Sequence, residues 1–161
     1  MNAMDLQTET IRRLDEARVA YQVLSHDQPV FTCEDAARAR NVSVAQVTKT
    51  MLGKDPDGQI YAILLPGDRK LKIKRVRQAA GGKRIELVPP EEIGSQLGLI
   101  VGAISPVDLV GRAEIYIDRR LLDQDTVTIS AGVPEAGIAL SPQHLVELLG
   151  GQVGEYVSTS V

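Results

Sequence analysis

The segment from Gly98 to Pro106 constrains the fold of this chain more than any other. It is an apolar run, Gly-Leu-Ile-Val-Gly-Ala-Ile-Ser-Pro, which Gly102 interrupts and Ser105-Pro106 closes. A glycine inside a strand pattern gives up packing and chain entropy, and it usually marks a bulge or a close approach to the main chain. The proline also removes an N–H from a strand ladder. We therefore expect a glycine-interrupted strand here, with another group lying close to its backbone.

The rest of the chain alternates between strand-like and helix-like spacing of apolar residues. Strands are expected at residues 21–25, 47–53, 59–65, 84–88, 113–118, 126–130 and 137–140. Helices are expected within the first twenty residues, at 32–39, between Asp68 and Gly81, at 90–98 and from Pro142 to Gly150. Capping residues mark several helix starts, as Thr32 does for the second helix. This mixed order, without a repeat or a linker, predicts an α+β domain.

Length and composition limit the class of protein. A chain of 161 residues with 43% hydrophobic residues suits one compact domain over residues 1–161. The only cysteine, Cys33, excludes an intramolecular disulfide, and no Cys/His cluster has the spacing of a zinc site. The longest apolar run, 97–104, is too short to span a bilayer of about 30 Å. We expect a cytoplasmic protein without a targeting or membrane segment.

Positive charge gathers in residues 69–84, although the net charge of the chain is -3. This segment contains eight of the 18 Lys and Arg residues and no acid, which leaves 10 basic against 21 acidic residues elsewhere. Helical spacing places three of its cations on one face: Lys70, Lys74 and Arg77. The segment is either the solvated face of an amphipathic helix or a surface that attracts a polyanion, and both interpretations stay open. The candidate RNA-binding residues are Lys70, Lys72, Lys74, Arg75 and Arg77.

Aromatic residues are too few for a base-stacking platform, since the chain has no Trp, one Phe and four Tyr. Recognition through phosphate charge and a small pocket fits this composition better. That combination favours an enzyme acting on the end of a nucleic acid over a protein that reads its sequence, and we expect RNA rather than DNA as the partner.

Lys49 is the strongest single candidate for a functional side chain. It lies in the expected strand 47–53, where alternation puts it on the same face as two apolar residues, Val47 and Met51. A lysine between apolar neighbours can protect a sheet edge from aggregation. It can also be a point charge with three donors that binds a phosphate or polarises an ester carbonyl.

No nucleophile-and-base arrangement stands out in the sequence. The Gly-x-Ser-x-Gly motif of serine hydrolases is absent. Cys33 follows the threonine that caps an expected helix, and a position at a helix N-terminus can lower the pKa of a thiol. We nevertheless interpret Cys33 as a small packed residue. His26 and His144 are available as bases, yet both are expected to be surface or loop residues. Any hydrolysis would then depend on positioning and polarisation of the substrate.

Three motifs together resemble the YbaK family and the related editing domain of bacterial prolyl-tRNA synthetases. They are Val47-Thr48-Lys49-Thr50, the Gly102 to Pro106 segment and Ser130-Ala131-Gly132, in the family's order. The resemblance implies a mixed, barrel-like sheet with helices packed around it. It also implies a stand-alone deacylase that hydrolyses mischarged aminoacyl-tRNA, without a metal or an organic cofactor. A synthetase is a further candidate partner.

The resemblance assigns roles to particular residues. Lys49 would bind the anion or carbonyl, and Gly102 would donate its backbone N–H to the oxyanion. Substrate-binding positions would be Phe31, Ser105, Pro106, Ser130 and Gly132, with Ser130-Ala131-Gly132 as a turn in the opposite pocket wall. The alternatives are a bulge at Gly102 and a plain hairpin at Gly132.

Two positions depart from the branch of the family that acts on cysteinyl-tRNA, namely Leu24 in place of a tyrosine and Ala139 in place of an acid. A small amino acid such as Cys or Ala on tRNA-Pro is the expected substrate. The departures keep a second hypothesis open, in which the same fold binds tRNA or a synthetase without catalysis.

Overall fold

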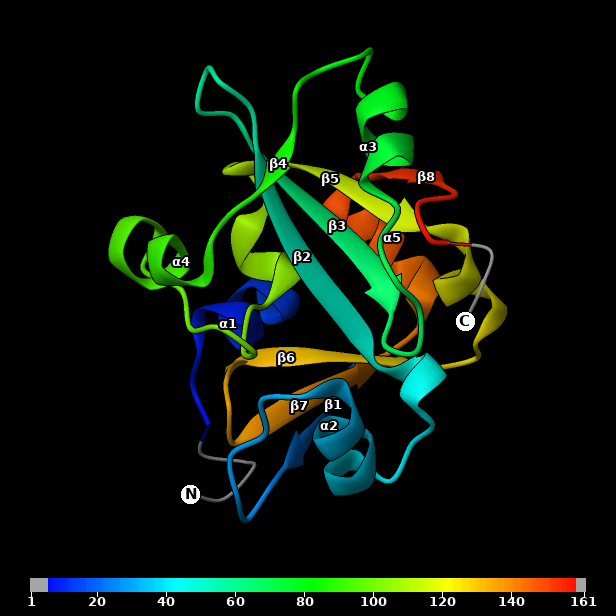
Figure 1. Ribbon diagram of the computed structural model, residues 1–161. Coiled ribbons are helices and arrows are strands. Elements are labelled where there is room, and N and C mark those ends of the chain that lie inside the picture. Colours follow the sequence, from blue (N-terminus) through cyan, green and yellow to red (C-terminus); the bar gives the residue numbers. More distant parts are fainter. Residues whose placement is uncertain (1–5, 159–161) are drawn as a thin grey trace.

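The strands form two sheets that cross each other (Figure 1). The computed structural model describes residues 6–158. The larger sheet has the order β4 (Glu86–Leu87), β2 (Thr48–Lys54), β3 (Ile60–Pro66), β5 (Ala113–Asp118) and β8 (Gln152–Gly154). The smaller sheet has the order β1 (Tyr21–Ser25), β7 (Ala136–Leu140) and β6 (Val127–Val133). Only the β3–β5 and β5–β8 pairs are parallel.

Five α-helices surround the two sheets within the described residues. They are α1 (Glu9–Glu16), α2 (Cys33–Arg40), α3 (Ile73–Ala79), α4 (Pro90–Leu97) and α5 (Pro142–Leu149). Short 3-10 helices follow at η2 (Val44–Gln46), η3 (Pro106–Leu109) and η4 (Arg119–Asp123). None of the helices in residues 6–158 has the length and apolar character needed to cross a bilayer.

The main hydrophobic core fills the space between the two sheets. Alternate residues of β3, such as Ala62 and Leu64, face this core together with Ile129 and Ile138 of the smaller sheet. The other β3 residues, among them Ile63, pack beneath α3 in a second cluster. Because both faces of β3 are covered, its sequence is a continuous apolar run rather than an alternating one.

The two sheets meet where Val47 forms a parallel bridge with Thr128 of β6. Val47 is 3% exposed and Thr128 is 0% exposed, so this junction is sealed from solvent. The Val47 carbonyl also accepts from Gly67 N at 2.7 Å, which ties the junction to the end of β3. From this point β2 and β6 diverge.

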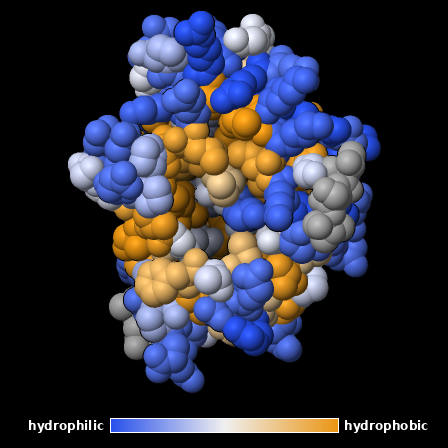
Figure 2. Space-filling view, in the orientation of Figure 1, coloured by the Kyte–Doolittle hydropathy of each residue, from blue (hydrophilic) through white to orange (hydrophobic). Residues whose placement is uncertain are grey.

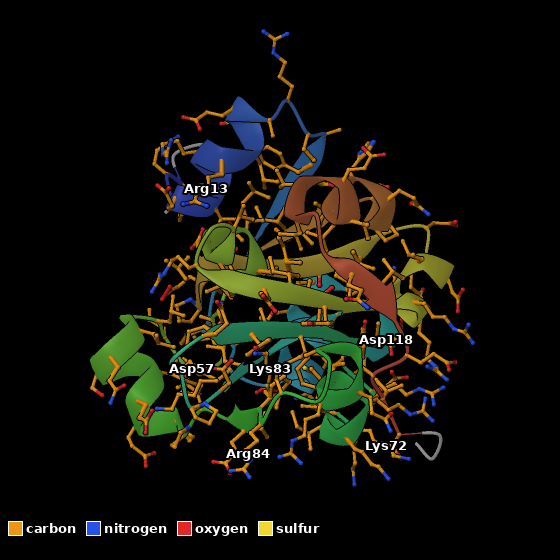
Figure 3. All side chains as sticks on the ribbon, turned by 90° about the horizontal axis from the view of Figure 1, so that it is seen from above. Arg13, Asp57, Lys72, Lys83, Arg84 and Asp118 are labelled. Atoms are coloured by element: carbon orange, nitrogen blue, oxygen red, sulfur yellow. The ribbon has the colours of Figure 1, made fainter. Side chains whose placement is uncertain are left out.

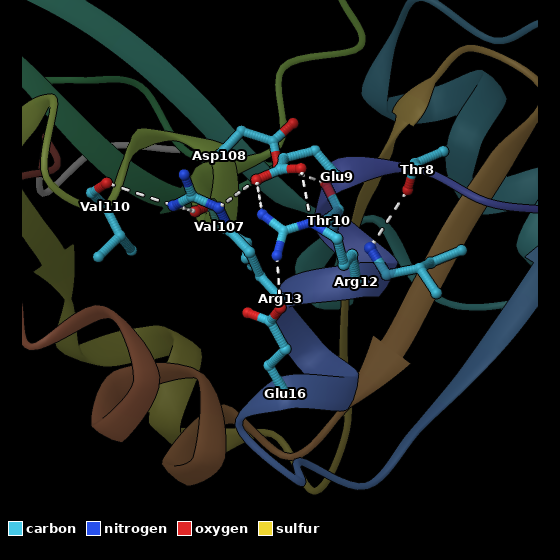
Figure 4. Close-up of polar contacts among 10 residues, drawn as sticks. Thr8, Glu9, Thr10, Arg12, Arg13, Glu16, Val107, Asp108 and Val110 are labelled. Atoms are coloured by element: carbon cyan, nitrogen blue, oxygen red, sulfur yellow. Dashed lines mark hydrogen bonds and ion pairs between the residues drawn. The ribbon is translucent and has the colours of Figure 1, made fainter.

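Helix α1 is attached to η3 by side-chain contacts (Figure 4). Thr10 Oγ1 donates to Asp108 Oδ1 at 2.8 Å, and Arg13 Nη1 donates to the carbonyls of Val107 and Val110 at 3.2 and 3.3 Å. Burial raises the pKa of Asp108 above its ordinary value. These bonds hold η3, and with it Pro106, against the N-terminal part of the described chain.

The α+β class expected from the sequence is confirmed, and most expected elements are present. The strands at 21–25 and 113–118 are found with the expected bounds, and Thr32 caps α2 through Asp35 N. The sheets do not close into a barrel within residues 6–158. The short strand β8 was not expected from the sequence.

The expected strand over residues 98–106 is wrong. Residues 98–105 form a loop between α4 and η3, with Gly102 at a φ of +84°. A β-carbon on Gly102 would lie 2.9 Å from the Phe31 carbonyl oxygen and 3.1 Å from Phe31 Cα. The group that approaches this glycine is therefore the backbone of Phe31, just before α2.

The Gly102–Phe31 contact predicts a specific loss of stability in Gly102→Ala. The left-handed φ costs about 1–2 kcal/mol for any L-residue, and the clash with backbone adds about 1–3 kcal/mol. Gly111→Ala is the matched control, because Gly111 has a φ of +85° and nothing within 4 Å of its β-carbon position. Urea unfolding should show the larger loss for Gly102→Ala, and equal losses would contradict the contact.

Candidate functional site

A cavity of about 630 Å³ opens where β2 and β6 diverge. Its walls come from β2, from α2 and the residues before it, from the β4–α4 connection, from the loop before η3 and from β6. Figure 2 shows this hollow with apolar residues around it and hydrophilic residues above. The volume falls within the usual range of small-molecule sites, about 300–1,000 Å³.

The cavity lies along the half of β2 that has a strand partner on one side only. β4 pairs with β2 only at Gly53 and Lys54, and Leu52 O accepts from Val88 N at 2.9 Å. The buried hydroxyls of Thr48 and Thr50, both on the cavity wall, have no hydrogen-bond partner among the described residues. The sequence analysis did not single out these threonines as site residues, although they flank Lys49. Unpartnered hydroxyls at a cavity wall are available to a ligand or to water.

Lys49 lines the cavity. Its Nζ donates to the carbonyl oxygen of Arg69 at 2.8 Å, in the connection between β3 and α3. An ammonium group has three N–H donors, so two remain for another partner. Lys49 is half-buried on a cavity wall, so its surroundings differ from those of a lysine that only guards an exposed sheet edge.

Phe31 and Gly102 lie together at the mouth of the cavity. The Phe31 side chain is 55% exposed, and Leu87 and Val101 are 47% exposed. We call Phe31, Leu87 and Val101 the apolar rim, since all three also line the cavity. The Gly102 N–H donates to none of the described residues.

Of the other expected site residues, some line the cavity and some do not. Ser130 of β6 lines the cavity, but Ser105, Pro106 and Gly132 do not. Ser105 is 1% exposed with an unpartnered hydroxyl, and Pro106 starts η3. Gly132 faces Thr10 and Asp108, on the side of α1.

The turn expected at Ser130-Ala131-Gly132 is wrong. These residues lie inside β6, where the register with β7 shifts between Ser130 and Val133, and Gly132 N donates to Ser130 Oγ at 3.0 Å. The chain reverses after Val133 instead. Leu24 of β1 and Ala139 of β7, which differ from the family pattern, do not line the cavity.

Arg40 is a cavity residue that the sequence analysis missed. It is the last residue of α2, and its side chain lies across Gly137 of β7. Nη1 donates to Thr128 Oγ1 at 3.0 Å, and Nε donates to His26 Nε2 at 3.3 Å. Burial lowers the pKa of Arg40 to about 10, so it stays charged at neutral pH. Sequence offered only a helix-ending arginine, which is common on protein surfaces.

His26 and Cys33 are not arranged as a nucleophile and its base. His26 Nε2 accepts from Arg40, and Nδ1 lies 3.2 Å from the Pro134 carbonyl, so the ring is neutral with its hydrogen on Nδ1. Burial is the main cause that lowers the pKa of His26. Burial raises the pKa of the Cys33 thiol, which disfavours the reactive thiolate. Within residues 6–158, no group of three or more His, Cys, Asp or Glu side chains could hold a metal ion.

The basic segment 69–84 is partly different from the expected helix. α3 begins only at Ile73, so Lys70 and Lys72 precede it and do not share a helix face with Lys74. These three lysines are exposed, with no acidic partner among the described residues. In Figure 3, Lys72, Lys83 and Arg84 lie on the same side of the molecule as α3, away from Arg13.

Two arginines expected to bind RNA are held by the protein itself. Arg75 pairs with Glu155 at 3.6 Å, and Arg77 Nε donates to the Ile85 carbonyl at 2.8 Å. Both are half-buried. The freely presented charge on this surface therefore comes mainly from the exposed lysines and Arg84.

The fold is an α+β domain with a cavity that is lined by apolar side chains and by Lys49 and Arg40. The chain belongs to the family described as the aminoacyl-tRNA editing domain, whose model matches residues 27–148.

Similar proteins cover almost the whole chain. The prolyl-tRNA editing protein ProX of Acetoanaerobium sticklandii is 25% identical, over 91% of this chain and 92% of that protein. EbsC of Enterococcus faecalis, named as a candidate Cys-tRNA(Pro)/Cys-tRNA(Cys) deacylase, is 22% identical over 92% of each chain. The crystal structure of the hypothetical protein APE2540 superposes with a TM-score of 0.85 at 30% identity, over 93% of this chain and 100% of that one.

The half-buried, neutral His26 predicts a pH dependence of stability. Its pKa in the folded protein lies below the ordinary 6.5, so the unfolded chain takes up a proton first as the pH falls. The contribution of His26 is complete above pH 6.5 and is lost as the pH falls toward the lowered value. Urea unfolding of wild type and His26→Gln from pH 7.5 to 5 should show a shallower pH dependence in the variant. Parallel curves would contradict a neutral imidazole in the folded protein.

Proposed function

We propose that this protein is a stand-alone aminoacyl-tRNA deacylase, a hydrolase of the ester that links an amino acid to tRNA. The observation that carries this proposal is the cavity, where Lys49 and Gly102 line one space and where Cys33 has no hydrogen bond to a histidine among the described residues. Family membership and the names of two similar proteins support it. We place the activity in the cytoplasm, with no metal or organic cofactor.

In the proposed reaction a water oxygen adds to the ester carbonyl carbon. The bond from that carbon to the ribose oxygen then breaks. One water proton passes to the ribose oxygen, and the products are tRNA with a free terminal hydroxyl and the free amino acid. Lys49 Nζ and the Gly102 N–H stabilise the negative charge on the carbonyl oxygen. The cavity contributes orientation, which replaces much of what a nucleophilic side chain would provide.

The proposed substrate is tRNA-Pro that carries a small amino acid such as Cys or Ala. The cavity has an apolar part, in which we place the side chain of the amino acid, formed by Val47 before β2, Leu52 of β2 and Ile93 of α4. Exclusion by size is then the main source of selectivity, and one methyl group changes it by only about 1–3 kcal/mol. The names of the two relatives, which refer to prolyl-tRNA editing and to Cys-tRNA, support this choice.

Lys49→Ala should lower kcat/KM for the preferred aminoacyl-tRNA at least about a hundredfold, since loss of one oxyanion donor has effects of this size. Lys54→Ala is the matched control, because Lys54 is on the same strand but pairs with Glu92 and does not line the cavity. The assay is single-turnover hydrolysis of Cys-, Ala-, Ser- and Pro-tRNA-Pro. Binding of tRNA without hydrolysis of any ester by wild type would favour a non-catalytic binding module.

We propose that the exposed lysines beside α3 bind tRNA phosphates. The triple variant Lys70→Ala/Lys72→Ala/Lys74→Ala should bind tRNA more weakly, and the slope of log affinity against log salt should fall by about 2. A triple alanine variant at the exposed residues Arg12 of α1, Arg18 just after α1 and Arg38 of α2 removes equal charge and serves as control. Equal slopes in the two variants, measured by filter binding, would show that charge alone matters and not its place.

A further inference from the structure

Arg40 lies on the cavity wall, in a space that the glycine at position 137 leaves open. A β-carbon on Gly137 would collide with Arg40 Nε, and it would lie 2.9 Å from Cδ, so only glycine lets the side chain lie flat on β7. The φ of Gly137 is outside the left-handed region, so backbone conformation does not require glycine there. The glycine at position 137 therefore leaves the space that the guanidinium occupies.

The guanidinium is oriented by neutral groups only. His26 Nε2 and Thr128 Oγ1 accept from Nε and Nη1. An arginine has five N–H donors, so three remain, including both on Nη2. His26 is in turn held by the Pro134 carbonyl. These contacts fix the direction of the free donors without neutralising the charge.

No carboxylate within residues 6–158 forms an ion pair with Arg40. Arg40 is half-buried, and a charge partly withdrawn from water without a counter-charge is costly, so proteins normally pair such groups. Arg40 also lines the cavity proposed as the site of hydrolysis. The missing counter-charge can therefore come from a bound ligand.

We propose that Arg40 binds the phosphate that precedes the terminal adenosine of the acceptor end, at a subsite separate from Lys49. This inference rests on the proposed function. Every aminoacyl-tRNA carries that phosphate, whereas the aminoacyl group itself offers an anion only if its side chain is acidic. The planar fork of arginine matches two phosphate oxygens, while the lysine ammonium suits a single carbonyl oxygen.

The two cations then have different tasks in one cavity. Lys49 is held by the Arg69 carbonyl on the side of the larger sheet, and Arg40 by Thr128 on the smaller sheet. Both charges act on the Cys33 thiol at the start of α2, which indicates that they share one electrostatic environment. A ligand with a phosphate and an ester would contact both sheets at once. His26 is a positioning residue in this arrangement, because it orients Arg40.

Binding of adenosine 5′-monophosphate and of adenosine, measured by calorimetry, tests the subsite without catalysis. Wild type should bind the monophosphate at least about tenfold more tightly, as expected for charge-assisted hydrogen bonds. Arg40→Gln should lose this preference. Gly137→Ala, which keeps the charge but displaces the guanidinium, should lose most of it. Arg38→Gln, on the exposed side of α2, should keep it. An unchanged preference in Arg40→Gln would overturn the proposal.

Hydrolysis separates this inference from the proposed function. Arg40→Gln should lower kcat/KM for aminoacyl-tRNA, through a higher KM, by at least about tenfold more than it lowers kcat/KM for 2′(3′)-O-aminoacyl-adenosine, which has no phosphate. Equal losses on both substrates would overturn the phosphate assignment, and a loss confined to Asp and Glu esters would assign Arg40 to a side-chain carboxylate instead. If wild type cleaves no ester but prefers the monophosphate through Arg40, the deacylase proposal fails and the phosphate subsite stands.

Discussion

The bridge between Val47 and Thr128 is the contact on which the arrangement of the molecule depends. It joins the two sheets, and both of its residues are buried. Because β2 continues away from it with one edge uncovered, a space must open between the sheets. The same threonine accepts a hydrogen bond from Arg40. The Val47–Thr128 junction therefore borders the hydrophobic core on one side and the cavity on the other.

The second constraint is the close contact of Gly102 with Phe31. It brings the loop after α4 against the segment before α2, so that two pieces far apart in sequence form one side of the cavity mouth. Phe31 is exposed beside this contact, and both residues line the cavity. The cavity combines an apolar rim with two cations and unpartnered hydroxyls. Such a site suits catalysis by positioning and polarisation more than by covalent chemistry.

Sequence patterns identified the elements whose causes are local. Thr32 caps α2, Pro142 begins α5, and the alternation around Lys49 placed it on a strand, because each signal lies within a few residues. The segment 98–105 was misread because its apolar residues resemble a strand, whereas the positive φ at Gly102 and the distant Phe31 decide its path. Arg40 was not identified as a cavity residue because its position depends on a contact with Gly137, nearly a hundred residues later. Local spacing carries no information on such pairs.

The proposed function requires that the cavity between the sheets holds the scissile ester. A crystal structure with a non-hydrolysable analogue, alanine joined through an amide to 3′-amino-3′-deoxyadenosine 5′-monophosphate, tests this requirement. We expect the analogue to lie in the cavity, with its amide carbonyl oxygen within hydrogen-bond distance of Lys49 Nζ. Binding of the analogue only outside the cavity, or with that carbonyl directed away from Lys49, would refute the proposed role of the cavity.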